Sequence, residues 1–96
     1  MEYNLIACPQ KFINIAEAFG ENTAGLPEIE AARLAVKAIK SILDDMKISY
    51  RLRDYDVPKD AFADLAKATI GAARLISNNP RSVSEKDVID LLEANY

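Results

Sequence analysis

The feature that most constrains the fold is a long stretch between Pro27 and Lys47 that contains no Gly and no Pro and is rich in Ala. Such a composition has high helix propensity and predicts one long helix. Its apolar residues form two adjacent stripes at helical spacing, one of Ile29, Ala32, Val36, Ile39 and Leu43, the other of Ala35, Ala38, Ile42 and Met46. This apolar face is wider than that of a surface helix. We therefore expect this helix to be the centre of the fold and to pack on two neighbours.

Helical patterns also lie on both sides of this stretch. Before it, Pro9 suits a first helical position, where its missing N–H is not needed, and apolar residues then recur at helical spacing as far as a glycine C-cap at Gly20. After it, an Ala-rich run begins near Asp60. The apolar face of this run consists of Phe62, Leu65, Ala66, Thr69, Ile70 and Ala73. Gly71, in the middle of the run, is interpreted as a point of close helix–helix approach rather than a functional residue.

The last helix has the best-defined start in the chain. Ser84 can accept from the N–H of Asp87 while that carboxylate reaches back, which is an Asp form of the capping box. Val83 and Val88 occupy the two positions of a hydrophobic staple. The sequence therefore predicts a helix that begins directly after Ser84.

These elements define the fold class. Helices with short connections, and no strand pattern of any length, predict an all-α protein, a small antiparallel-type bundle of about four helices. The segment "ISYRLRDYDVP" has no clear period and ends at Pro58, so it is interpreted as a structured connector. With 96 residues, the chain has the size of one small domain, here taken as residues 1–96.

Several kinds of chemistry are excluded by composition. The sequence has no His, which removes the commonest general base and the commonest metal ligand. It also has no glycine pattern that could cradle a phosphate. The charged residues at helical spacing, Glu30 with Arg33 and Lys40 with Asp44, are interpreted as surface ion pairs. On its own chemistry the chain is not expected to be catalytic.

One charged cluster leaves two interpretations open. Arg51 and Arg53 could clamp an anion, or they could pair with the neighbouring Asp54 and Asp56. Internal pairing is the favoured interpretation.

Charge and cysteine content bear on partners and location. The net charge of -3, with acids and bases interleaved, gives no basic stripe for nucleic acid and no polybasic run for a membrane. Cys8 is the single cysteine, as is typical of a reducing compartment. No signal peptide or membrane-spanning run is recognisable, so we expect a cytoplasmic protein with neither nucleic acid nor membrane as a partner.

The segments "KFINIAEAFG", "ISYRLRDYDVPKDAFADLAKAT", "NNPR" and "VSEKDVIDLLEANY" occur in an order that resembles the C-terminal end of the iron-containing (group III) alcohol dehydrogenases. Each segment alone is weakly specific, but their order and spacing around the NPR turn are more so. The resemblance covers essentially the whole chain. It implies the C-terminal part of the helical domain of a dehydroquinate synthase-like or iron alcohol dehydrogenase fold.

The resemblance also implies a function. Family members are NAD(P)-dependent alcohol or aldehyde oxidoreductases that hold iron or another divalent metal through one Asp and three His. Those ligands and the nucleotide-binding lobe precede the part that this chain resembles, so no metal ligand, cofactor-binding residue or catalytic residue is carried over. The chain would complete the helical lobe and one wall of the substrate cleft, and it would be inactive alone.

Individual residues follow from the resemblance. Leu75 stands where several family members have a Cys beside the cleft, which makes Leu75 and Ile76 candidate cleft-lining residues. Asn79, Pro80 and Arg81 form the landmark turn and are assigned a structural role. The family usually has Gly where this chain has Lys47 and Asp56, and we expect either different turns there or left-handed backbone at some cost in free energy.

A segment of this kind would expose apolar surface that the rest of the enzyme covers. We therefore expect self-association or a companion chain that carries the rest of the dehydrogenase, with the wide face of the Pro27–Lys47 helix near the contact. A stand-alone helical protein-interaction module is the alternative, and binding of a small ligand in the bundle core is a weaker one.

Overall fold

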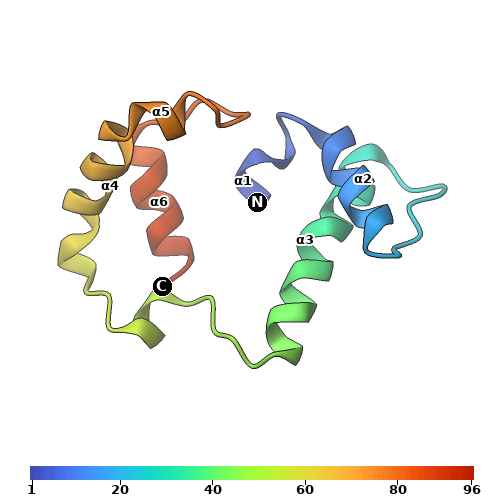
Figure 1. The fold of residues 1–96 in the computed structure, drawn as a ribbon, viewed down its shortest axis with the longest axis horizontal. Coiled ribbons are helices and arrows are strands. Elements are labelled where there is room, and N and C mark those ends of the chain that lie inside the picture. Colours follow the sequence, from blue (N-terminus) through green and yellow to red (C-terminus); the bar gives the residue numbers. More distant parts are fainter. The chain divides into compact units, whose positions relative to one another are not determined.

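The computed structural model describes residues 1–96 and contains helices but no strands (Figure 1). The α-helices are α1 (Glu2–Leu5), α2 (Pro9–Ala18), α3 (Glu28–Asp45), α4 (Phe62–Gly71), α5 (Ala73–Ile76) and α6 (Glu85–Ala94), and the 3-10 helices are η1 (Leu52–Tyr55) and η2 (Lys59–Ala61). The all-α prediction is confirmed, and α2, α3, α4 and α6 are the helices that the sequence indicates. The short helices α1 and α5 were not expected.

The chain divides into two compact units, residues 1–48 and residues 49–96. The assignment of residues 1–96 to a single domain stays a prediction. No helix in either unit is long and apolar enough to cross a membrane.

In the first unit, α3 packs against both α2 and α1, as the width of its apolar face predicts. The core combines Leu5 and Phe12 with the small residues Ala16, Ala32 and Ala35. Alanines on α3 leave room for the α2 backbone to approach closely, because the distance between packed helices depends on the side chains at the contact. The Phe12 ring then fills the space that the alanines leave.

The wide face of α3 is covered only in part. Its buried residues are all alanines, the last of which is Ala38. Towards the C-terminal end, Ile42 and Met46 remain 40% and 62% exposed. The C-terminal part of the second stripe is therefore uncovered within this chain.

Helices α2 and α3 end in the same way. After α2, the N–H of Gly20 donates to the carbonyl of Glu17 at 2.9 Å and that of Glu21 donates to Ala16 at 3.0 Å, which is a Schellman motif. After α3, the N–H groups of Lys47 and Ile48 make the equivalent bonds. The central residue of such a motif has left-handed backbone, so the glycine C-cap predicted at Gly20 is confirmed at φ 84°.

Two non-glycine residues adopt the same backbone conformation. Lys47 has φ 56° and Asp56, at the end of η1, has φ 57°. Of the two alternatives that the sequence leaves open at these positions, left-handed backbone is the one observed. Each costs free energy, since the Cβ of an L-residue crowds the neighbouring carbonyl oxygen in this region.

In the second unit, α4 packs on α6. Phe62, Ala66 and Val88 are buried between these helices, with exposures of 4%, 0% and 8%. The ring of Tyr96 meets that of Phe62 edge to face, with centroids 5.8 Å apart. The N–H of Leu52 in η1 donates to the carbonyl of Asn95 at 2.8 Å, so the connector is structured as predicted.

The predicted run from Asp60 through Gly71 differs from the structure in two places. The α-helix begins at Phe62, after the 3-10 turn η2, and it ends at Gly71 rather than continuing to Ala73. The break is at Ala72, whose ψ of 57° is not helical. A Cβ on Gly71 would meet no atom within 4 Å, so no close helix approach occurs there within this chain, and that interpretation is wrong.

Candidate functional site

The candidate cleft-lining residues lie on α5, the four-residue helix that follows the break at Ala72. Leu75 is 73% exposed, whereas Ile76 is half-buried. No other large hydrophobic residue of the chain is as exposed as Leu75. An isolated exposed leucine needs no explanation, so the cleft-lining role of Leu75 and Ile76 stays a prediction.

The turn after α5 is held by side-chain amides. The Nδ2 of Asn78 donates to the carbonyl of Arg74 at 2.9 Å, and the N–H of Asn79 donates to that of Ile76 at 3.0 Å. The Nδ2 of Asn79 donates to the carbonyl of Arg81, across Pro80. The first two bonds satisfy carbonyls that α5 leaves unpaired at its end, and the third lies within the turn. They fix the path of the chain, while the structural role assigned to the Arg81 side chain stays a prediction.

The capping box at the start of α6 is confirmed. The Oγ of Ser84 accepts from the N–H of Asp87 at 3.2 Å, and the N–H of Ser84 donates to the Asp87 carboxylate at 2.9 Å. At the staple positions, Val83 is half-buried and Val88 is buried. The cap and the turn before it therefore hold both ends of the loop between α5 and α6.

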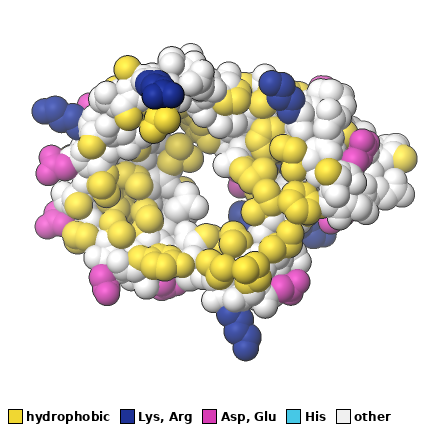
Figure 2. Space-filling model, viewed as in Figure 1, with side chains coloured by type: hydrophobic (Ala, Val, Ile, Leu, Met, Phe, Trp, Pro, Cys, Tyr) yellow, Lys and Arg dark blue, Asp and Glu magenta, His cyan; other side chains and the backbone are white.

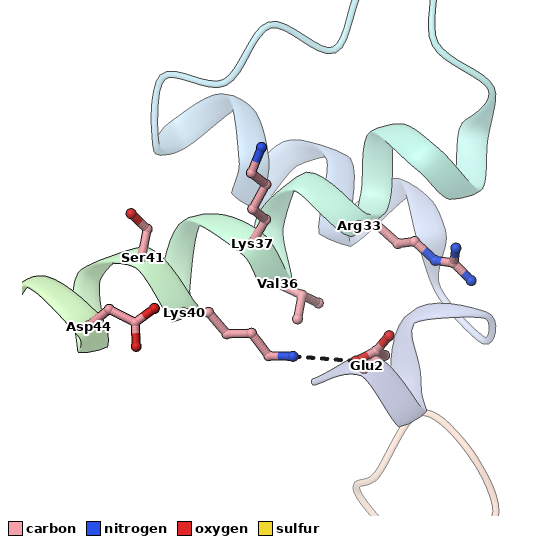
Figure 3. A pocket seen from close by; sticks show the side chains of 7 residues that line it. All are labelled: Glu2, Arg33, Val36, Lys37, Lys40, Ser41 and Asp44. Atoms are coloured by element: carbon pink, nitrogen blue, oxygen red, sulfur yellow. Dashed lines mark ion pairs between the residues drawn. The ribbon is translucent and has the colours of Figure 1, made fainter. Parts of the chain in front are cut away.

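A shallow hollow of about 450 Å³ lies between α1 and α3 (Figure 3). Its lining residues are Glu2, Arg33, Val36, Lys37, Lys40, Ser41 and Asp44. Figure 3 shows Lys40 extended towards Glu2, and the Nζ of Lys40 lies 3.8 Å from a carboxylate oxygen of Glu2. Both side chains are at least half exposed, so the pair is screened by water and contributes little to stability.

The predicted surface pairs on α3 are wrong. Lys40 pairs with Glu2 of α1 instead of Asp44, and Arg33 forms no ion pair with Glu30. Sequence spacing identifies which side chains can meet on one helix, but here a residue from another helix offers an alternative carboxylate.

The favoured interpretation of the arginines in the connector is also wrong. Neither Arg51 nor Arg53 forms an ion pair with a carboxylate. The carboxylate of Asp54 accepts instead from the hydroxyl of Ser49. The hydroxyl of Tyr55 donates to the carbonyl of Ser49 at 2.6 Å. The hydrogen bonds of Ser49 therefore link residues of the connector to one another.

The chain offers no prepared acid, base or metal site. No group of three or more His, Cys, Asp or Glu side chains could hold a metal ion, so the residues present do not fit the metal of the resembled family. No polar or charged side chain is buried. Hydrogen bonding to Asp90 raises the pKa of Lys86, but that pair lies on the exposed side of α6.

Comparison with known proteins places this arrangement in a family. Residues 1–96 match the Fe-containing alcohol dehydrogenase family, C-terminal. The chain belongs to the iron-containing alcohol dehydrogenase family. It is 42% identical over 94 residues to 1,3-propanediol dehydrogenase from Citrobacter freundii and 31% identical over 96 residues to sulfoacetaldehyde reductase from Bilophila wadsworthia. Each of these matches covers 98% of the chain.

Solved structures of the iron-containing alcohol dehydrogenases agree with the fold. A crystal structure of 1,3-propanediol oxidoreductase matches 98% of the chain with a TM-score of 0.92 and 35% identity. An alcohol dehydrogenase from Oenococcus oeni matches 99% with a TM-score of 0.91 and 33% identity. The chain covers 24% of the length of each of these two proteins, and about a quarter of the curated relatives named above. The resemblance to the C-terminal helical part of the family is confirmed.

Proposed function

We propose that this chain acts as the C-terminal helical part of an NAD(P)-dependent, metal-dependent alcohol dehydrogenase. The observation that carries the proposal is the match along 98% of the chain to 1,3-propanediol oxidoreductase, at a TM-score of 0.92 and 35% identity. At this level both the fold and many of the side chains agree. The bound metal would polarise the alcohol oxygen and the nucleotide would accept the hydride, and both would be held by residues outside these 96.

The contribution of the chain itself would be one wall of the substrate cleft. Leu75 supports this role because its side chain is 73% exposed although it is apolar. Ile76 is half-buried and would anchor α5, while the amides of Asn78 and Asn79 hold the turn behind it. An aliphatic wall would exclude water from the alcohol carbon and favour apolar substrate chains.

The proposal includes a partner. Figure 2 shows hydrophobic side chains at the surface of both units, and the exposed ones on the first unit include Ile42 and Met46 near the end of α3. Apolar surface of this kind favours association with the rest of a dehydrogenase polypeptide or with a second copy. The first of these partners is the one that a catalytic role requires.

A chimeric enzyme tests the proposal. The C-terminal quarter of Citrobacter freundii 1,3-propanediol dehydrogenase is replaced by this chain, and NAD(P)H formation is followed with 1,3-propanediol as substrate. We expect metal-dependent turnover, which a version that ends before the replaced quarter does not give. A folded, metal-loaded chimera without turnover would show that this chain cannot complete the enzyme.

The proposed role of Leu75 in the cleft wall is tested separately in the same chimera. Leu75→Ala removes apolar contact from the cleft and should lower kcat/KM for the alcohol by about tenfold, since a few methylene groups in an apolar pocket contribute roughly 1–3 kcal/mol. Leu26→Ala, in the loop before α3, removes an equally large exposed side chain outside α5 and serves as the control. Equal kcat/KM values for the Leu75→Ala chimera and the parent chimera would show that Leu75 does not contact the substrate in the cleft.

A further inference from the structure

Helix α4 has a second apolar face besides the one that packs on α6. Ala61, Leu65, Ala68 and Ala72 follow one another at intervals of four, three and four residues. On a helix this spacing falls along one line, as in the contact line of a coiled coil. Leu65 and Ala68 lie on α4, while Ala61 ends η2 and Ala72 is the break after α4. We call these four residues the outer seam.

The outer seam is separate from the other two sides of α4. The side buried against α6 carries Phe62 and Ala66. Charge is confined to a third side, which carries Asp64 and Lys67. With about 100° between successive helical residues, the outer seam lies roughly a quarter turn from the buried side. A helix that is apolar on two sides is typical of one with two packing neighbours.

The middle of the outer seam is uncovered in this chain, whereas Ala61 and Ala72 at its two ends are half-buried. Leu65 is 41% exposed and Ala68 is exposed. A Cβ added to Gly71 would meet no atom within 4 Å, so the space beside the end of α4 is open too. Leu75, the most exposed large hydrophobic residue, follows directly.

The residue types indicate what kind of group fits. Three of the four positions are Ala, which lets another backbone approach closely, and Leu65 provides one large side chain to fill a hole in a facing helix. The outer seam carries no charge and no hydrogen-bonding side chain, so a polar ligand or a nucleic acid has nothing to contact. An apolar face of a helix has the matching shape and chemistry.

We propose that the outer seam is the docking surface for a helix from the remaining part of the dehydrogenase. The inference rests on the proposed function. The chain spans 24% of the length of the 1,3-propanediol dehydrogenase that it resembles, so about three quarters of such a polypeptide are available to supply the helix.

The test compares the 96-residue chain with the chimeric 1,3-propanediol dehydrogenase that contains it. Ala68→Glu places a charge in the outer seam, and Lys67→Glu, one residue away on the charged side, is the matched control. Ala68→Leu is a second seam variant that keeps the position apolar but is too large for close helix packing. Thermal unfolding is measured for all three variants in both proteins.

We expect Ala68→Glu to lower the Tm of the chimera by about 5–10 °C, because an unpaired charge becomes buried, and Ala68→Leu to lower it by less. Neither substitution should change the Tm of the 96-residue chain, where the side chain faces water, and Lys67→Glu should change neither protein by more than about 2 °C. Turnover is measured separately. A chimera that is inactive but shows this Tm pattern would contradict the proposed function and still support the outer seam as a docking surface.

Three results would overturn the docking surface. First, if both seam variants leave the Tm of the chimera unchanged, no helix packs on the outer seam. Second, if Ala68→Glu lowers the Tm of the 96-residue chain as much as that of the chimera, the chain covers the outer seam itself. Third, if the 96-residue chain sediments as a dimer that Ala68→Glu dissociates, the occupant is a second copy.

Discussion

Replacing Lys47 with Gly should stabilise this protein, although the change removes a side chain and adds backbone freedom. Lys47 occupies the left-handed position of the Schellman motif that ends α3, with φ 56°. Its N–H donates to the carbonyl of Asp44 at 3.0 Å, and the N–H of Ile48 donates to Leu43 at 2.9 Å. Gly makes both bonds without the crowding of a Cβ.

The magnitude follows from two opposing terms. Left-handed backbone costs an L-residue roughly 1–2 kcal/mol, which Gly avoids. The greater freedom of Gly in the unfolded chain costs about 0.4–1 kcal/mol. The free energy of unfolding should therefore rise by about 0.5–1 kcal/mol, which raises the Tm of a domain of this size by about 4 °C.

Urea unfolding followed by far-UV circular dichroism measures this change, with the midpoint compared at constant m-value. Lys47→Ala removes the amino group but keeps the Cβ, so it should give no increase. Lys37→Gly makes the same chemical change at an exposed position inside α3, and it should lower the free energy of unfolding by about 0.7 kcal/mol. The reasoning is refuted if Lys47→Gly lowers stability as Lys37→Gly does, or if Lys47→Ala stabilises as much as Lys47→Gly.

Three other changes test separate parts of the structure. Ser84→Ala removes the acceptor for the N–H of Asp87 and should cost about 1 kcal/mol in urea unfolding, while Ser84→Asp restores most of it; equal stability of the two variants would argue against the cap. Ala35→Leu inserts volume into a fully buried position and should cost about 1–3 kcal/mol, so an unchanged unfolding midpoint would mean that the α2–α3 contact is loose. The raised pKa of Lys86 stabilises the folded state below the ordinary lysine pKa, and this contribution is lost as pH rises through the raised value. Lys86→Met should therefore lose less stability than the parent chain between neutral and strongly alkaline pH, and identical pH profiles would contradict the pairing with Asp90.

Local features of the fold could be predicted because they depend on neighbouring residues alone. The Pro9 start, the Gly20 end and the Ser84 capping box all involve bonds within one turn of a helix. The left-handed backbone at Lys47 was expected because its neighbours match a family that has Gly there. These local hydrogen bonds are present in the folded protein because the packing of distant helices does not compete with them.

Side-chain partners could not be predicted in the same way. Lys40 lies one helical turn from Asp44, yet it pairs with Glu2 of another helix at 3.8 Å. Exposed ion pairs differ by only a few tenths of a kcal/mol, so the spacing on one helix does not decide between them. Asp54 likewise accepts from the hydroxyl of Ser49 rather than pairing with a neighbouring arginine. Ser49 is itself held in the connector by the hydroxyl of Tyr55, which donates to its carbonyl.

The sequence by itself determined the existence of α2, α3, α4 and α6, the caps at Gly20 and Ser84, and the family, because propensity, capping and motif order are properties of the chain. Only the tertiary structure decided which apolar faces are covered. It left Met46 and Leu75 exposed, ended α4 at Gly71, and turned Leu65 away from α6. The physical reason is that a pattern identifies an apolar face but not its neighbour, and the neighbours of these faces are set by the lengths and positions of other helices.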